Sequence, residues 1–146
     1  MDLFTFQKHV QTRQTLTIGG VAYQVEGIAE LQVGGTYGPV VAFLSGGEWL
    51  VPDVVGKRYV FVQTTPGTQH TPAPTQWTTA GELFTRRDLF SFVVVEVFGQ
   101  TPLTRGEKVF VTEYQGARGG LVWMVDGGTG ILRVLLGRFL KEHQVV

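Results

Sequence analysis

Three short apolar runs, separated by glycine-bounded connections, constrain this chain more than any other feature of its sequence. The runs are Phe92–Phe98, Lys108–Tyr114 and Leu121–Val125. Their β-branched and aromatic side chains fit a pleated, buried surface better than a helix. We therefore predict three consecutive β-strands. A fold class does not by itself imply an activity, so function has to be argued from particular residues.

The part of the chain before these runs has the same rhythm of strands and turns. The Gly19-Gly20 pair supplies the positive φ angles that a two-residue hairpin turn needs. The rhythm from Gly20 to Val62 resembles that of small bacterial barrel modules of the SH3 type, and the resemblance implies a barrel without implying an activity. Strands are predicted here over residues 16–18, 21–31, 40–44, 48–51 and 58–62.

Helices are predicted at three places. The segment from Ile131 to Lys141 has apolar side chains at helical spacing and polar ones opposite, which indicates an amphipathic C-terminal helix. A short N-terminal helix is expected with Asp2 as its N-cap, and another from Thr79 to about Leu89, opened by a capping box. The predicted fold class is therefore mainly β (α+β): a bent antiparallel sheet or small SH3-like barrels, with the C-terminal helix and one or two short helices.

The length of 146 residues is that of one domain, and we predict a single domain over residues 1–146. Residues 64–79 break the strand pattern because they hold three prolines and almost no aliphatic side chain. This stretch is either a functional loop or a linker. In the second case it divides an N-terminal β lobe, 1–63, from a C-terminal β-α lobe, 80–146.

Charge and composition exclude several classes of protein. Twelve basic residues balance twelve acidic ones, whereas a protein that neutralises phosphates needs a clustered positive field, so nucleic acid is the less favoured partner. No apolar run approaches the roughly 20 residues that span a bilayer. The chain has no cysteine, which removes disulfides and thiolate metal sites. We therefore expect a protein of the cytoplasm, or of a host cytoplasm if a virus encodes it.

A search for catalytic patterns finds none. The three histidines, His9, His70 and His143, are isolated and form no local metal-binding pair. The glycine-rich segments lack the lysine and the strand–loop–helix context of a phosphate loop. Neither Ser45 nor Ser91 lies in a Gly-x-Ser-x-Gly elbow. We predict no metal, no cofactor and no enzymatic activity.

The hairpin of residues 91–98 and 107–114 offers a candidate contact surface. If the numbers of paired residues add up to 206, valines occupy one face, and Lys108 comes within reach of Glu96 on the other. That other face is either a platform for a partner or is covered by the C-terminal helix. Its candidate residues are Phe92, Glu96, Phe98, Lys108, Phe110 and Tyr114.

Further candidates lie outside this hairpin. Trp77 stands in the stretch rich in proline and threonine, where its ring either anchors in a partner's pocket or folds the loop back onto the sheet. Tyr37 is an aromatic residue in a glycine-rich loop. Arg86 and Arg87 lie on the short helix predicted to begin at Thr79.

Together these features favour a non-enzymatic module that binds a larger protein, such as a small regulator, a virus-encoded inhibitor or an adaptor. The first alternative is a small β-barrel that binds single-stranded nucleic acid through aromatic stacking and basic loops. The second is an enzyme with a composite pocket. Such a pocket would require His70 or the glutamates to converge near Arg105 or Arg118.

Overall fold

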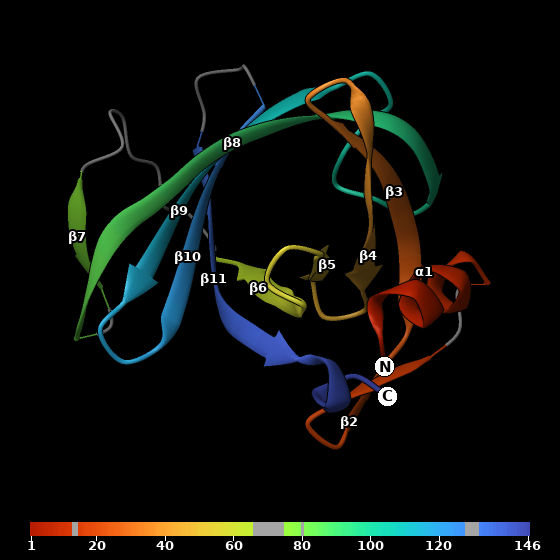
Figure 1. The fold of residues 1–146 in the computed structure, drawn as a ribbon, viewed down its shortest axis with the longest axis horizontal. Helices are drawn as coiled ribbons and strands as arrows, with labels where there is room; N and C mark the ends of the chain where they lie inside the picture. The colour runs from red at the N-terminus through yellow and green to blue at the C-terminus, as the bar shows by residue number, and fades with distance from the viewer. Residues whose placement is uncertain (13–14, 66–74, 80, 128–131) are drawn as a thin grey trace.

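The computed structural model of the chain describes residues 1–12, 15–65, 75–79, 81–127 and 132–146 (Figure 1). Within these residues an N-terminal helix precedes a series of β-strands. In chain order the elements are α1 (Leu3–Gln11), β1 (Leu16–Ile18), β2 (Val21–Tyr23), β3 (Val25–Val33), β4 (Thr36–Leu44), β5 (Glu48–Asp53), β6 (Arg58–Thr64), β7 (Gln76–Thr79), β8 (Glu82–Gly99), β9 (Lys108–Gly116), β10 (Gly120–Asp126), β11 (Leu132–Lys141) and the 3₁₀ turn η1 (Glu142–Gln144).

The described strands form an antiparallel sheet that closes on itself. Apart from the β1-β2 hairpin, the sheet has nine strands in the order β3-β4-β5-β6-β11-β10-β9-β8-β7. The long strand β8 pairs with β9 near its start and with β3 near its end. Because β7 is an extension outside the ring, the other eight of these nine strands make a closed barrel (Figure 1).

The prediction of a mainly β fold with a barrel is confirmed, but the barrel differs from the predicted one. The SH3-like rhythm of residues 20–62 belongs to a larger ring, because β6 pairs with β11 and β3 pairs with β8. Strands from the ranges 1–63 and 80–146 therefore belong to one sheet.

Apolar side chains fill the interior of the barrel. Alternate residues of a strand point to the same side, and the inward-pointing residues of all eight strands meet in one buried cluster. Gly137 lets β11 approach β6 closely, because a Cβ at this position would lie 1.8 Å from the carbonyl oxygen of Phe61. The buried members are Ala29, Leu31, Val41, Phe43, Trp49, Val51, Val60, Val62, Phe92, Val94, Leu103, Val109, Val111, Leu121, Trp123, Val125 and Leu135.

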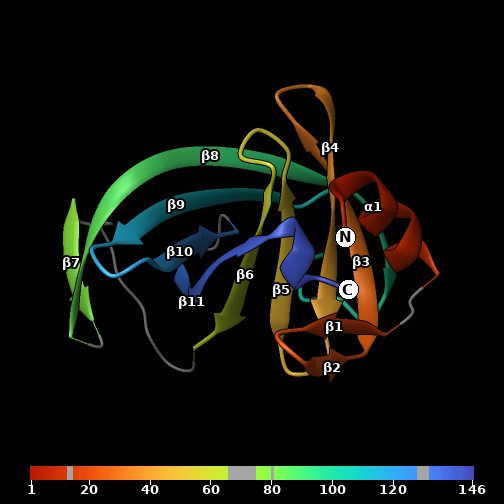
Figure 2. The same cartoon turned by 60° about the horizontal axis from the view of Figure 1, so that its bottom comes forward.

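A second apolar cluster lies on the outside of the barrel. Phe6 and Val10 of α1 pack there with residues of β1 and with outward residues of β3 to β6. Figure 2 shows α1 and the β1-β2 hairpin on one side of the barrel and β7 on the other. The predicted N-cap is confirmed, since the Asp2 carboxylate accepts a hydrogen bond from the backbone N–H of Thr5 at 2.8 Å.

The predicted C-terminal amphipathic helix is wrong. Residues Leu132–Lys141 form β11, which lies between β6 and β10 in the barrel. Leu135 points into the barrel, whereas Val134 and Leu140 are buried on its outer side. A strand buried on both faces has no alternation of apolar and polar residues, and the spacing of its leucines then imitates a helix. Ile131, the first residue of the predicted helix, lies outside the described residues.

The short helix predicted from Thr79 to Leu89 is also wrong. Thr79 ends β7, and β8 begins at Glu82 after a turn in which Gly81 has a φ of +74°. The Glu82 carboxylate accepts hydrogen bonds from the backbone N–H groups of Arg118 (2.7 Å) and Gly120 (3.2 Å). The glutamate that suggested a capping box therefore holds the β9–β10 turn.

Candidate functional site

The register of the β8–β9 hairpin differs from the predicted one and changes the candidate surface. Phe92 pairs with Val109 and Val93 pairs with Lys108, so the residue numbers add up to 201 and not to 206. The shift is odd, and a shift by an odd number moves one strand's side chains to the opposite face. Val109 and Val111 consequently share the barrel interior with Phe92 and not with Val93.

Two of the predicted surface aromatics are therefore buried. Phe92 is 4% exposed inside the barrel. Tyr114 is fully buried on the outer side of the barrel, where it packs with Phe84 and residues of β10 and β11. Burial raises the pKa of the Tyr114 phenol, and the nearby Arg86 opposes this shift.

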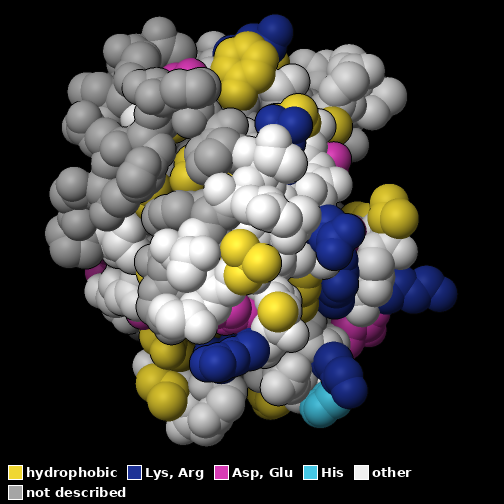
Figure 3. Space-filling view, turned by 90° about the vertical axis from the view of Figure 1, so that its left-hand side faces the viewer, with side chains coloured by type: hydrophobic (Ala, Val, Ile, Leu, Met, Phe, Trp, Pro, Cys, Tyr) yellow, Lys and Arg dark blue, Asp and Glu magenta, His cyan; other side chains and the backbone are white. Residues whose placement is uncertain are grey.

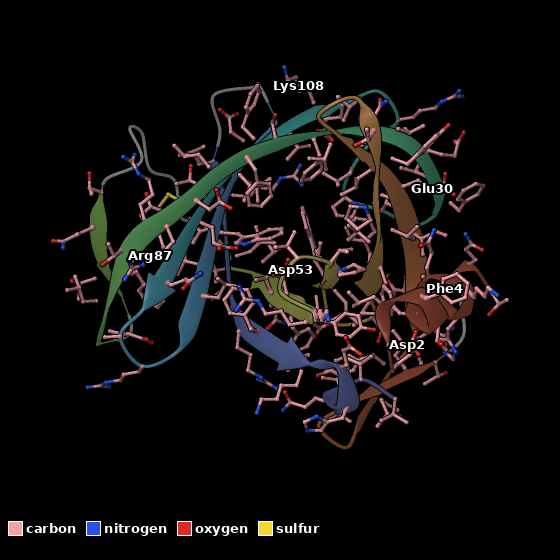
Figure 4. The ribbon with its side chains drawn as sticks, viewed as in Figure 1. Asp2, Phe4, Glu30, Asp53, Arg87 and Lys108 are labelled. Carbon is pink, nitrogen blue, oxygen red and sulfur yellow. The ribbon has the colours of Figure 1, made fainter. Side chains whose placement is uncertain are left out.

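The predicted ion pair between Glu96 and Lys108 does not form. Glu96 lies directly opposite Glu30 of β3, and its nearest cation is Arg105, with 3.8 Å between Arg105 Nε and Glu96 Oε2. Lys108 lies at the start of β9, and its Nζ is 5.2 Å from the ring centroid of Phe110. In Figure 4, Lys108 projects away from the barrel, and Glu30 lies on the opposite side of the barrel from Arg87.

An exposed apolar strip remains on the outer face of β8 and β9. Leu89 is 62% exposed and Phe110 is 46% exposed. Leu89 pairs with Thr112, and Phe110 pairs with Ser91, so the two apolar side chains are diagonal neighbours on one face. We call this strip, together with the basic residues Arg86 and Lys108 of the same face, the β8–β9 patch.

Basic side chains stand at both ends of the β8–β9 patch. Arg86 pairs with Tyr114 at one end, and Lys108 pairs with Val93 at the other. The pairing is shifted between Arg86 and Asp88, so Arg87 is the extra residue of a β-bulge. Both arginines are exposed. Figure 3 views the molecule from the β7 side and shows apolar side chains beside several lysine and arginine side chains.

The remaining predicted residues lie on other parts of the surface. Tyr37, at the tip of the β3–β4 hairpin, is 87% exposed, and Phe98, near the end of β8, is 47% exposed. Trp77 lies in β7, where its backbone pairs with Phe84, and its side chain is outside the description. The structure thus brings together Arg86, Lys108 and Phe110, and separates them from Tyr37 and Phe98.

Sequence reasoning missed a pocket at one mouth of the barrel. The pocket has a volume of about 250 Å³. It lies where β4, β5 and β6 meet the β8–β9 connection, and its charged lining residues are Glu26 and Glu48. The local signal is the acidic residue that follows the Gly46-Gly47 turn at the start of a buried strand. The lining is Glu26, Phe43, Leu44, Gly47, Glu48, Trp49, Thr64, Gln100, Thr101 and Pro102.

The second buried carboxylate of the described residues lies inside the barrel. Glu113 is 8% exposed and accepts hydrogen bonds from Trp123 Nε1 at 2.9 Å and from Gln115 Nε2 at 3.3 Å. The Trp123 ring also packs edge-to-face on Phe90, with the ring centroids 5.4 Å apart. This network gives a buried charge its hydrogen-bond donors and ties β9 to β10.

The composite catalytic pocket considered from the sequence would bring glutamates near Arg105 or Arg118. Arg105 Nε lies 3.8 Å from Glu96 Oε2, and the Arg118 backbone N–H donates to the Glu82 carboxylate, but none of these four residues lines the pocket at the barrel mouth. His70 lies outside the described residues. The described part of the chain also contains no group of three or more histidine, aspartate or glutamate side chains that could hold a metal ion.

Comparisons with known proteins return nothing that bears on these sites: no family model, no curated protein and no solved structure matches the chain. Among the described helices, none has the length and apolar character needed to cross a membrane.

Proposed function

We propose that this chain is a non-enzymatic module that binds a larger protein through the β8–β9 patch. The observation that carries the proposal is the exposure of Leu89 and Phe110 as diagonal neighbours on one outer sheet face. Exposed apolar side chains rimmed by polar ones are typical of protein interaction sites. In most interfaces a few central residues contribute most of the binding energy, and a polar rim surrounds them.

The charge of the patch selects the chemistry of the partner. Arg86 borders the apolar strip at one end and Lys108 at the other, and the exposed bulge residue Arg87 adjoins Arg86. Complementary charge speeds the encounter of two proteins and suppresses wrong partners. We therefore expect a partner surface with an apolar centre and an acidic rim. A regulator, an inhibitor or an adaptor would each fit this description.

Paired variants test the proposal. Phe110→Ser and Leu89→Ser remove the apolar centre, and Val55→Ser in the β5–β6 turn, where the valine is 97% exposed, is the matched control. A protein captured by the wild-type chain should lose at least about 2 kcal/mol of binding free energy, roughly thirtyfold in Kd, with either patch variant. The control should bind like the wild type. Equal capture by all variants would exclude the patch as the docking site.

Charge reversal tests the acidic rim separately. Arg86→Glu should slow association and reduce its dependence on salt, whereas Lys141→Glu on β11 serves as an exposed control. Trp77, whose strand β7 pairs with the start of β8, remains a proposed anchor. If Trp77→Ala abolishes capture without lowering Tm, the anchor is supported; a large loss of stability would show that the ring holds β7 in place.

Single-stranded nucleic acid is the second candidate partner. The supporting observation is Phe110 itself, because an exposed ring with Lys108 Nζ 5.2 Å from its centroid can stack on a base beside a phosphate. A labelled oligonucleotide should then bind at low salt, lose affinity steeply toward physiological salt and fail to bind Phe110→Ser. No binding at low salt would remove this candidate and leave the protein partner.

A further inference from the structure

The pocket at the barrel mouth contains a buried acidic side chain that forms no ion pair with a cation of the described residues. Glu48 is 8% exposed, and its Oε1 accepts a hydrogen bond from the backbone N–H of Gly46 at 2.8 Å. The ion pairs of the described residues, Arg58–Asp53 and Arg105–Glu96, do not involve it. A buried carboxylate without a counter-charge is costly, so such groups are normally paired.

The second oxygen of this carboxylate also lies beside Gly46, because a Cβ on Gly46 would be 2.2 Å from Glu48 Oε2. Glu48 Oε2 makes no hydrogen bond within the described residues. No fully buried side-chain oxygen among those residues lacks a hydrogen-bond partner, so Oε2 must be in contact with solvent. Glu48 is also one of the residues that line the pocket. A solvent-accessible carboxylate oxygen of a lining residue can accept a hydrogen bond from a bound cation.

The rest of the lining fits a cation with an apolar stem. Glu26, which is exposed, adds a second negative charge at the rim. Phe43 and Trp49, which are 4% and 2% exposed, close the pocket on the side of the barrel interior, with their ring centroids 5.3 Å apart at an interplanar angle of 89°. Arg133 is not a lining residue, and its guanidinium donates a hydrogen bond to the carbonyl oxygen of Pro102 at 3.3 Å.

We infer that this pocket binds a single ammonium or guanidinium group at the end of a short alkyl chain. A volume of about 250 Å³ is below the roughly 300–1,000 Å³ of sites for drug-sized ligands, which suits one side chain or one small amine. The cation bonds to Glu48 Oε2 and is attracted by Glu26, and its short alkyl chain lies against the apolar part of the lining. This site is additional to the β8–β9 patch and does not depend on it.

Two sources can supply this group: a free small cation, or a lysine or arginine side chain of a peptide. Titrations followed by the amide NMR signals of Gly46, Gly47 and Thr101 compare butylguanidinium with N-acetyl-arginine amide. N-acetyl-citrulline amide is the neutral isostere. We expect saturable shifts with a cation at millimolar or lower concentration and none with citrulline. Tighter binding of the amino-acid derivative would indicate a peptide source, and equal binding a free cation.

Variants test the assigned residues. Glu48→Gln keeps an acceptor for Gly46 N–H but removes the charge, and should weaken binding at least about tenfold, equivalent to 1.4 kcal/mol. Glu26 is exposed, so Glu26→Gln should be tolerated more easily and should weaken cation binding about threefold. Glu30→Gln, on the outer face of β3, is the control and should bind like the wild type. The inference is overturned if neither cation gives saturable shifts, if citrulline binds as well, or if both pocket variants bind like the wild type.

Discussion

Removing the ring N–H of Trp123 should destabilise the barrel through the buried Glu113 carboxylate. Trp123 and Glu113 lie directly opposite each other on β10 and β9, and the N–H donates to the carboxylate at 2.9 Å. Trp123→Phe keeps an aromatic ring and deletes this donor. Of its hydrogen bonds with the described residues, the carboxylate then retains the longer one, from Gln115 at 3.3 Å.

The expected loss follows from the burial and the charge. A hydrogen bond to a charged group contributes about 1.5–3 kcal/mol. When its partner is removed, the free-energy cost of desolvating the buried group is no longer offset. For a chain of this size each kcal/mol shifts Tm by about 2–4 °C, so Tm should fall by about 3–12 °C. The smaller ring leaves a cavity that adds to the loss, and the cavity has to be separated from the hydrogen bond.

A double-mutant cycle with Glu113→Leu makes that separation. Replacing both partners by apolar groups of similar shape is close to neutral, so adding Glu113→Leu to Trp123→Phe should recover stability. Urea denaturation followed by circular dichroism measures the four free energies of unfolding. We expect a coupling energy of at least about 1.5 kcal/mol between the two positions.

Trp49→Phe is the matched control for this cycle. Trp49 is as buried as Trp123, at 2% against 3% exposure, and donates to no carboxylate of the described residues. Its coupling to Glu113→Leu should be below about 0.5 kcal/mol, as for independent sites. A similarly small coupling for Trp123 would refute the argument, because the cost of Trp123→Phe would then be the cavity alone.

Three further changes test other parts of the fold. Gly137→Ala places a Cβ 1.8 Å from the Phe61 carbonyl oxygen and should cost about 1–3 kcal/mol in urea denaturation; unchanged stability would contradict the close approach of β11 to β6. Tyr59 donates to the carbonyl oxygens of Met1 and Asp2, and burial raises the pKa of its phenol, so its contribution is complete below about pH 10 and is lost at higher pH. Tyr59→Phe should therefore flatten the alkaline decline in stability, and an unchanged decline would argue against this assignment. Hydrogen bonds to the first turn of α1 lower the pKa of Asp2. Asp2→Ala should therefore be less stable than the wild type above about pH 4, and the difference in stability should shrink as the pH falls through the lowered pKa. A difference that does not change with pH would exclude the charged cap.

The strands that sequence analysis predicted correctly are those with a single clear pattern. The Gly19-Gly20 turn has φ angles of +58° and +81°, as a two-residue hairpin requires. The runs at Phe92–Phe98, Lys108–Tyr114 and Leu121–Val125 fall within β8, β9 and β10. In each case β-branched residues and flanking glycines indicate the same structure, so local chemistry was sufficient.

The errors arise where the surroundings decide the structure. β11 is buried on both faces because its inner side joins the barrel interior and its outer side joins the apolar clusters outside the ring, and its own residues do not encode these surroundings. The β8–β9 register depends on the connection from Gln100 to Glu107, whose Gly106 N–H donates to the Val94 carbonyl oxygen at 2.7 Å. A long connection leaves several registers open, so the apolar pattern alone favoured the wrong one.

The candidate sites were predictable to different degrees. Arg86 and Phe110 could be named from the sequence, because Arg86 belongs to an adjacent pair of arginines and Phe110 is an aromatic residue in a predicted strand. Whether they lie on the same face of the sheet depends on the register of β8 and β9. The pocket beside Glu48 could not be predicted, because it is built where separate strands meet the β8–β9 connection. A site made from distant segments requires the closed ring before it can be recognised.

The place of β11 has a consequence for how the chain reaches this state. β11 follows every other strand in sequence but lies between β6 and β10. Until β11 has been synthesised, β6 and β10 each have one edge of unpaired backbone N–H and C=O groups. Such edges can pair with other chains and promote aggregation. The final insertion joins residues 58–64 to 135–141, a separation that makes folding slow. A nascent chain stalled before this strand would be a substrate for chaperones.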